Sequence, residues 1–277
     1  MRRLPVTGAT VALLLFLAAS VPAEAEYHYR YEGSFSAEER FKLETWVGEV
    51  RRGLESLVGP FLFDVDVYFA RVDSGQPVVF SNTLRGKRQG IRLRVDPRYP
   101  LEDFLADWTA PHELSHLVLP YLGRDHSWFA EGFASFMQYQ VMHAMGTLST
   151  EQVAKRYAER IAGAAAAYRY AGVPFVRATP RLRQEHNYPT MYWGGAIFFL
   201  RLNEALMEQT DTDAISLVAD YMRCCRKSRD SLSGLVASLD DILGEPIVAG
   251  QLSAFRASEG FPAHDDLEPG VIRLEAN

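Results

Sequence analysis

The chain has 277 residues and a formal net charge of −6 at neutral pH. A mildly acidic chain has no broad electrostatic footprint for nucleic acid, so we expect no nucleic-acid partner. Its apolar and aromatic content is that of an ordinary folded protein, which excludes a disordered chain. The length allows one well-buried domain or two closely packed lobes.

The N-terminal segment has the layout of a secretory signal peptide. Arg2 and Arg3 give a positive start, an apolar run covers 11–21, and Ala23 and Ala25 are small residues of the kind that a signal peptidase reads. The run is shorter than the ~20 apolar residues that span a bilayer, and an uncleaved anchor is the alternative. We expect cleavage near Ala25, a secreted or periplasmic location, and no stable membrane insertion afterwards.

The region after the signal peptide predicts a helix and several strands. Ser36 caps a helix with acids in its first turn, and Gly59-Pro60 ends that helix. Strand-like runs are expected at 27–31, 61–69, 77–80 and 91–95. The clean alternation of Ile91–Val95 predicts an edge strand with one wet face. The basic stretch Ser81–Gly90 is interpreted as a solvated hairpin loop.

From Leu101 onward the pattern is helical. Helices are expected near 101–119, 128–146, 149–170, 190–209, 212–227, 231–243 and 246–258. Pro111 favours a kink in the first of them or a restart near Thr109. The segment 171–189 contains three prolines and predicts a long irregular loop, either a functional lid or a plain surface loop.

The two cysteines of the chain, Cys224 and Cys225, are adjacent in a run that looks helical. Because a bond between neighbours forces a strained ring, we expect half-buried thiols, with a vicinal disulfide as the alternative. No further cysteine completes a metal-binding set.

Two histidines suggest a metal site. His112 and His116 lie one turn apart on one face of a predicted helix, so that both imidazoles reach one zinc ion. Glu113 follows the first histidine and points toward the remaining coordination position, where it can take a proton from a water molecule. The alternative is a pair of ordinary histidines on a helix surface.

A catalytic zinc usually has three protein ligands and one open position. Glu131 is an acid within the otherwise apolar run Trp128–Phe136. A buried carboxylate is costly unless it is paired or bound to metal, so Glu131 is the predicted third ligand of one Zn²⁺ per chain. The alternative is a helix-end carboxylate that faces solvent.

These motifs resemble the gluzincin metallopeptidases, which combine HExxH with a downstream glutamate. The closest likeness in motif is to the aminopeptidase N and glycyl aminopeptidase families, which carry Trp-x-x-Glu-Gly-Phe or a close variant, and it covers Pro111 to Phe136. The run Tyr192–Ala196 resembles a downstream Tyr-x-x-Gly-Ala run, whose tyrosine hydroxyl stabilises a developing oxyanion. The resemblance implies that role for Tyr192; the alternative is a core tyrosine that opens a helix.

The resemblance implies a gluzincin catalytic domain over 26–277, of class α+β. A small N-terminal helix-plus-sheet part, 26–119, would place an edge strand over the helix of His112, and a mainly helical part, 120–277, would follow. The chain looks like a trimmed relative, because only fourteen residues separate His116 from Glu131.

One motif of the aminopeptidase N family is missing. The Gly-x-Met-Glu-Asn strand that grips the amino end of the substrate has no match between Glu26 and Ala110, and we take Ile91–Val95 as its structural equivalent. We therefore predict a zinc-dependent peptidase acting on a peptide or protein substrate, with endopeptidase action favoured. The alternatives are an aminopeptidase and a non-catalytic zinc- or peptide-binding module on the same scaffold.

Four further residues are candidates for supporting roles. Asp107 or Asp125 would orient a zinc-binding histidine, as carboxylates behind a metal site do. His126 would lie at the rim of the cleft, and His186 would donate a second hydrogen bond to the oxyanion, although each is also readable as a surface histidine.

Overall fold

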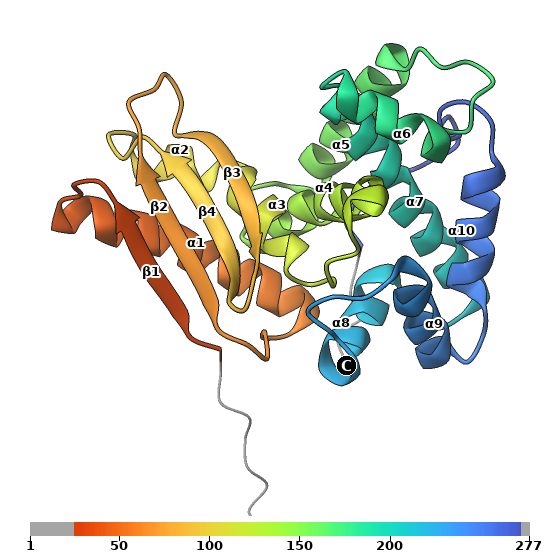
Figure 1. The fold of residues 1–277 in the computed structure, drawn as a ribbon, viewed down its shortest axis with the longest axis horizontal. Coiled ribbons are helices and arrows are strands. Elements are labelled where there is room, and N and C mark those ends of the chain that lie inside the picture. The colour runs from red at the N-terminus through yellow and green to blue at the C-terminus, as the bar shows by residue number, and fades with distance from the viewer. Residues whose placement is uncertain (1–24, 273–277) are drawn as a thin grey trace, which may run out of the picture.

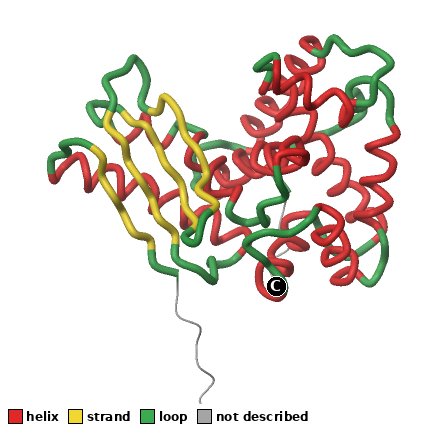
Figure 2. Tube along the Cα trace, viewed as in Figure 1, coloured by secondary structure: helices red, strands yellow, loops and turns green. Residues whose placement is uncertain are grey.

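The computed structural model describes residues 25–272; the predicted signal peptide lies outside the described residues, apart from Ala25, which is buried. The sheet forms one side of the molecule, and most of the helices form the other (Figures 1 and 2). The strands are β1 (Tyr27–Glu32), β2 (Val65–Arg71), β3 (Val78–Arg85) and β4 (Gln89–Val95). The helices are α1 (Ala37–Val58), α2 (Leu101–Leu105), α3 (Thr109–His116), the 3-10 helix η1 (Arg124–His126), α4 (Ser127–Ala144), α5 (Thr150–Ala167), α6 (Phe175–Gln184), α7 (Tyr188–Gln209), α8 (Ala214–Cys224), α9 (Leu232–Leu243) and α10 (Ile247–Ala257). The predicted α+β class is confirmed.

The sheet has the strand order β1-β2-β4-β3. β2 pairs in parallel with β1 and β4, and β3 returns antiparallel to β4. Between β1 and β2 the chain forms α1, which begins at the capping box of Ser36 and Glu39. In Figure 1, α1 lies behind the sheet. One hydrophobic cluster joins the two, and it includes Trp46 of α1, Phe69 of β2 and Leu93 of β4.

The edge strand beside α3 is β3, so the prediction that Ile91–Val95 forms this edge was wrong. Ile91–Val95 belongs to β4, which lies between β2 and β3. Its alternation reports a sheet with one buried face, and an interior strand of such a sheet alternates just as an edge strand does. The predicted hairpin loop Ser81–Gly90 is also wrong, because most of its residues pair in β3 and β4 and only 86–88 turn the chain.

Two predictions about helix boundaries have different outcomes. The helix expected at 101–119 is two helices, and the second restarts at Thr109 as anticipated, with Pro111 in its first turn, where a missing N–H costs little. The other predicted helices are present with ends shifted by at most three residues. In the described region, 25–272, no helix is both long and apolar enough to cross a membrane.

The loop expected at 171–189 is largely helix α6, which contains Pro180. Proline cannot donate to the carbonyl four residues earlier, that of Val176. The hydroxyl of Thr179 donates to this carbonyl instead, at 2.9 Å. The side chain therefore replaces the missing backbone donor, and α6 continues through the proline.

Helices α4 and α7 approach closely because glycines face each other. A Cβ on Gly132 of α4 would lie 2.3 Å from the carbonyl carbon of Gly195 on α7. A Cβ on Gly195 would lie 2.2 Å from the carbonyl oxygen of Trp128. No side chain fits at either position. This contact brings the turns that carry Glu131 and Tyr192 close together.

Cys224 and Cys225 form a disulfide, so the expectation of thiols was wrong and its alternative holds. The bond lies where α8 ends, rather than inside a continuous helix. The next residue, Arg226, turns toward the sheet. Its guanidinium donates to the carbonyl of Leu117, at 2.7 and 3.1 Å, and to Gln89 of β4, at 2.6 Å. Arg226 thereby links the helical part to the segment after α3 and to β4.

Candidate metal centre

Helix α3 carries His112, Glu113 and His116 into a space enclosed by β3, α4 and α7. The whole helix is buried. The two histidines lie one turn apart, and their ring centroids are 4.9 Å from each other. The helix therefore presents two imidazoles and one carboxylate from a single rigid element.

Glu131 of α4 faces both histidines. Its Oε2 lies 3.1 Å from Nε2 of His112 and 3.4 Å from Nε2 of His116. Two donor atoms bound to a tetrahedral zinc at about 2.0–2.1 Å are about 3.4 Å apart. The three ligand atoms lie within 4.8 Å of one another, close enough to hold one metal ion, and the two distances from Glu131 match those at a tetrahedral zinc. Among residues 25–272, no second group of three such side chains has this arrangement.

Gln138 of α4 holds the ring of His112. Its Oε1 lies 3.0 Å from Nδ1 of His112, and both side chains are buried. An amide oxygen only accepts, so Nδ1 carries a proton, and Nε2 is the nitrogen that faces Glu131 and would bind a metal. At His112 the orienting group is therefore Gln138; Asp107 and Asp125 were predicted to orient a zinc-binding histidine, and neither bonds to the ring of His112 among the described contacts. The signal in the sequence is that Gln138 follows Glu131 by two helical turns and so lies on the same face.

Charge compensation keeps Glu131 ionised. Burial raises the pKa of this carboxyl, but His116 and His112 outweigh the effect and hold the pKa well below its usual range. Burial lowers the pKa of His112, but the hydrogen bond and the charge of Glu131 raise it above its usual value. A buried anion between two imidazoles is a favourable environment for a cation.

Two hydroxyl groups of β3 hold Glu113. Ser81 Oγ donates to one carboxylate oxygen and Thr83 Oγ1 donates to the other, each at 2.7 Å. Ser81 and Thr83 are two residues apart on a strand, so both face α3. The sequence did not reveal these contacts, because Ser81 was assigned to a loop. Glu113 is therefore held beside the ligand set and is not a member of it.

Tyr192 of α7 lies against the ligand set. Its ring stacks on that of His112, with centroids 5.6 Å apart. Burial, followed by the charges of Glu131 and Glu113, raises the pKa of its hydroxyl, so that the hydroxyl keeps its proton at neutral pH. Tyr192 is therefore a neutral donor at the edge of the metal centre.

Two arginines bind the carbonyls at the C-terminal end of α3. Arg85 of β3 donates to the carbonyls of His116 and Leu119, and Arg226 donates to that of Leu117. Burial lowers the pKa of each guanidinium to about 10, so both remain charged at neutral pH. Positive charge at this end of a helix complements its dipole and satisfies its free carbonyls.

A cleft of about 400 Å³ opens beside the metal centre. It is lined by β3 and the segment before it, by the start of α3, and by Tyr192. Its lining residues include Val79, Trp108 and Asp107. The cleft reaches His112 and Glu113 and therefore gives access to the metal centre.

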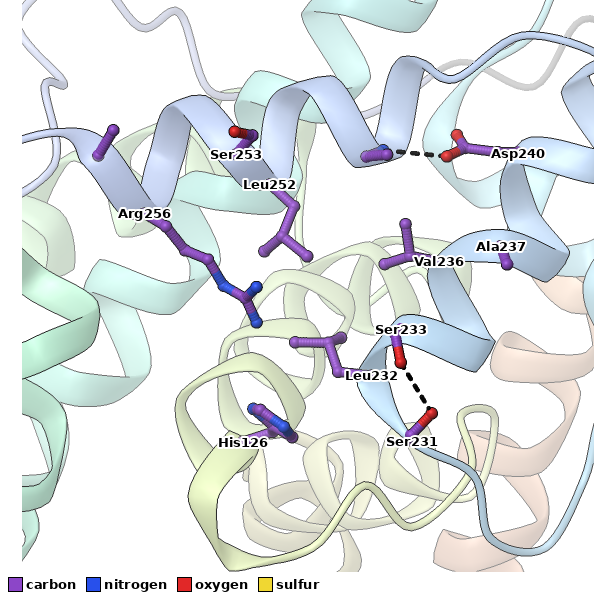
Figure 3. A pocket seen from close by; sticks show the side chains of 12 residues that line it. His126, Ser231, Leu232, Ser233, Val236, Ala237, Asp240, Leu252, Ser253 and Arg256 are labelled. Carbon is purple, nitrogen blue, oxygen red and sulfur yellow. Dashed lines mark hydrogen bonds between the residues drawn. The ribbon is translucent and has the colours of Figure 1, made fainter.

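A larger cavity, of about 820 Å³, lies between α9 and α10 (Figure 3). His126 lines this cavity and not the cleft, and burial followed by the charge of Arg256 lowers its pKa. His186 is exposed and packs against the ring of Tyr188. Neither histidine lines the cleft at the metal centre.

No protein-family model matches the sequence, and no curated protein matches it. Solved structures are similar in fold. An M1 zinc metallopeptidase from Deinococcus radiodurans aligns with a TM-score of 0.53 at 15% identity, over 90% of this chain and 51% of that chain. An aminopeptidase N family protein from Idiomarina loihiensis aligns with a TM-score of 0.57 at 15% identity, over 84% of this chain and 45% of that chain.

A third similar structure is yeast LTA4 hydrolase in complex with bestatin, with a TM-score of 0.55 at 12% identity, over 87% of this chain and 39% of that chain. This chain therefore spans about half the length of these proteins or less. The alignments cover most of the described sheet and helices. We conclude that the chain has the α+β fold seen in M1 zinc metallopeptidase structures.

Proposed function

We propose that this protein is a zinc-dependent peptidase in which His112, His116 and Glu131 hold the metal. The observation that carries the proposal is the convergence of three ligand side chains, in which Oε2 of Glu131 lies 3.1 and 3.4 Å from the two imidazole nitrogens, with the carboxylate of Glu113 fixed beside them. The likeness in fold to zinc metallopeptidase structures supports it.

Zinc at this site supplies Lewis acidity toward a peptide carbonyl and toward water. Glu113 takes a proton from the attacking water and then passes it to the leaving amine. Ser81 and Thr83 keep both oxygens of Glu113 oriented during these transfers. Tyr192 donates a hydrogen bond to the oxyanion that develops on the carbonyl.

We further propose aminopeptidase action, in place of the endopeptidase action that the sequence favoured. The sequence argument was the missing acid on the strand beside α3, and β3 indeed contains no Asp or Glu. The similar structures support the aminopeptidase, since one is an aminopeptidase N family protein. A variant of the Deinococcus radiodurans enzyme was solved with a Tyr-Ser-Ala substrate.

The test combines metal analysis with Glu113→Gln. We expect about one zinc per chain in both proteins, and hydrolysis of phenylalanine 7-amido-4-methylcoumarin by the wild type alone, with a loss of about 10²–10⁴-fold in the variant. Chelation should abolish the activity, and added zinc should restore it. A variant as active as the wild type would contradict the role of Glu113 in proton transfer. Bound zinc with no cleavage in a peptide library would favour the non-catalytic module.

We also propose that residues 26–277 form one catalytic unit that works outside the cytosol. The disulfide of Cys224 and Cys225 supports an oxidising compartment. N-terminal sequencing of the protein recovered from a secreting host should begin at Glu26. A chain that retains Met1 in that fraction would contradict cleavage.

A further inference from the structure

The cleft beside the metal centre contains an acid that takes no part in the metal cluster. Glu113 and Asp107 both line it, and Glu113 is held by β3. Asp107 lies two residues before α3, and its Oδ1 accepts a hydrogen bond from the backbone N–H of Thr109 at 2.7 Å. Among residues 25–272, no lysine or arginine lines the cleft. The cleft therefore has negative charge available for a ligand.

Asp107 lacks a cationic partner within residues 25–272, unlike two buried acids of the sheet part. Asp66 pairs with Arg30 and Arg88, and Asp96 pairs with Arg98. Burial raises the pKa of the Asp107 carboxyl, and no cation opposes this effect. The ionised form of such a partly buried carboxylate is stabilised when a cationic ligand donates charge-assisted hydrogen bonds to it.

Two apolar residues of the cleft lining are partly exposed. Val79 of β3 is 40% exposed, and Trp108 is 37% exposed. Exposed large apolar side chains at a cleft indicate a ligand that covers them. Trp108 directly follows Asp107, and an indole ring also attracts a cation over its face. The cleft thus offers an anionic and aromatic end together with an apolar wall.

We propose that Asp107 and Trp108 receive the free α-ammonium group of a peptide whose first side chain is large and apolar, and that this side chain lies against Val79. The inference rests on the proposed peptidase function and names its substrate class. It also identifies an acid that replaces the one that β3 lacks, because Asp107 lies in the segment just before α3.

The position of Asp107 in the cleft is consistent with this assignment. Asp107, His112 and Glu113 line the same cleft, so a peptide whose amino end lies at Asp107 extends along it toward the metal centre. The first peptide bond would then lie at the metal centre.

The test compares Asp107→Asn with the wild type on two probes, phenylalanine 7-amido-4-methylcoumarin and its N-acetyl derivative. Asparagine keeps an oxygen that accepts from Thr109 but loses the charge. We expect kcat/KM on the free-amine probe to fall about 10- to 100-fold, mainly through KM, with a change of less than about twofold on the acetylated probe. Asp103→Asn, at an exposed position of α2, removes the same charge and should change neither value.

An equal loss on both probes, or no loss on the free amine, would overturn the proposal. If Asp107→Asn does not fold, the wild type provides a second test. Competitive inhibition constants are measured for phenylalaninamide and for 3-phenylpropanamide, which lacks the amine. We expect the amine to bind at least about tenfold more tightly, and equal inhibition would refute recognition of the ammonium. If the acetylated probe is cleaved at least as fast as the free-amine probe, the protein is a peptidase but does not recognise the ammonium group. If no peptide is cleaved, the proposed peptidase function is itself rejected.

Discussion

Glu113 depends on two hydroxyl groups from another element for its position. Replacing them by Ser81→Ala and Thr83→Val should leave the carboxylate free to rotate while the metal ligands stay in place. We expect kcat to fall about 10- to 100-fold with zinc content unchanged, because a small misplacement of a reacting group is costly. Asn82→Ala, on the same strand and facing the other way, should have little effect. Loss of zinc from the double variant would show a structural role instead.

Gln138 fixes His112 and so contributes to zinc affinity. Gln138→Leu removes the acceptor at Nδ1, and we expect zinc affinity to drop about 10- to 100-fold in a competition assay with a chelator. Gln140→Leu is the matched control, because Gln140 is also a buried glutamine of α4 but bonds to Tyr157 and Ile272. It should lower stability without changing zinc affinity. Equal affinity losses in both variants would contradict the assignment.

The residues of the metal centre were predictable where the pattern lies within one helix. His112, Glu113 and His116 are encoded by their spacing alone, and Glu131 by its position in an apolar run. Gln138 and Ser81 were not identified, because their contacts join separate elements whose pairing the sequence does not display. A single sequence thus reveals ligands more readily than the groups that hold them.

At the scale of elements, the contact between α4 and α7 sets the distance from Glu131 to Tyr192. Gly195→Ala would place a methyl group against the carbonyl of Trp128, so the helices must separate. We expect the free energy of unfolding to fall by about 1–3 kcal/mol, with a loss of activity, measured by urea titration and by assay.

The control for this change is Gly163→Ala in α5, where a Cβ would meet nothing within 4 Å. Alanine at an open helical position should stabilise by roughly 0.5–1 kcal/mol. Similar behaviour of the two variants would mean that glycine at 195 is not required for packing.

The errors in element prediction have physical causes. Alternation in Ile91–Val95 identifies a strand with one buried face but does not say which strand pairs beyond it. Three prolines made 171–189 look irregular, but the hydroxyl of Thr179 supplies the donor that Pro180 lacks. Helix ends with strong caps, such as that of Ser36, were predicted well because the signal is local.

For the molecule as a whole, α3 is where the sheet part and the helical part meet. Arg226 crosses that boundary, since it binds the carbonyl of Leu117 and the side chain of Gln89. Arg226→Met should leave the buried carbonyl unpaired and lower the free energy of unfolding by about 1–3 kcal/mol in urea titration. Arg223→Met, which removes only an exposed ion pair with Asp220, should change it by less than about 0.5 kcal/mol. Equal effects would show that the two parts do not depend on Arg226.

The disulfide between Cys224 and Cys225 has a practical consequence for counting metal. Both cysteines of the chain are in this bond, so the oxidised protein offers no thiol to a soft cation. A thiol reductant in the buffer would release two adjacent sulfur ligands, and thiolates bind zinc strongly. A reduced sample would then take up zinc at two unrelated places, and its stoichiometry would no longer describe the histidine site.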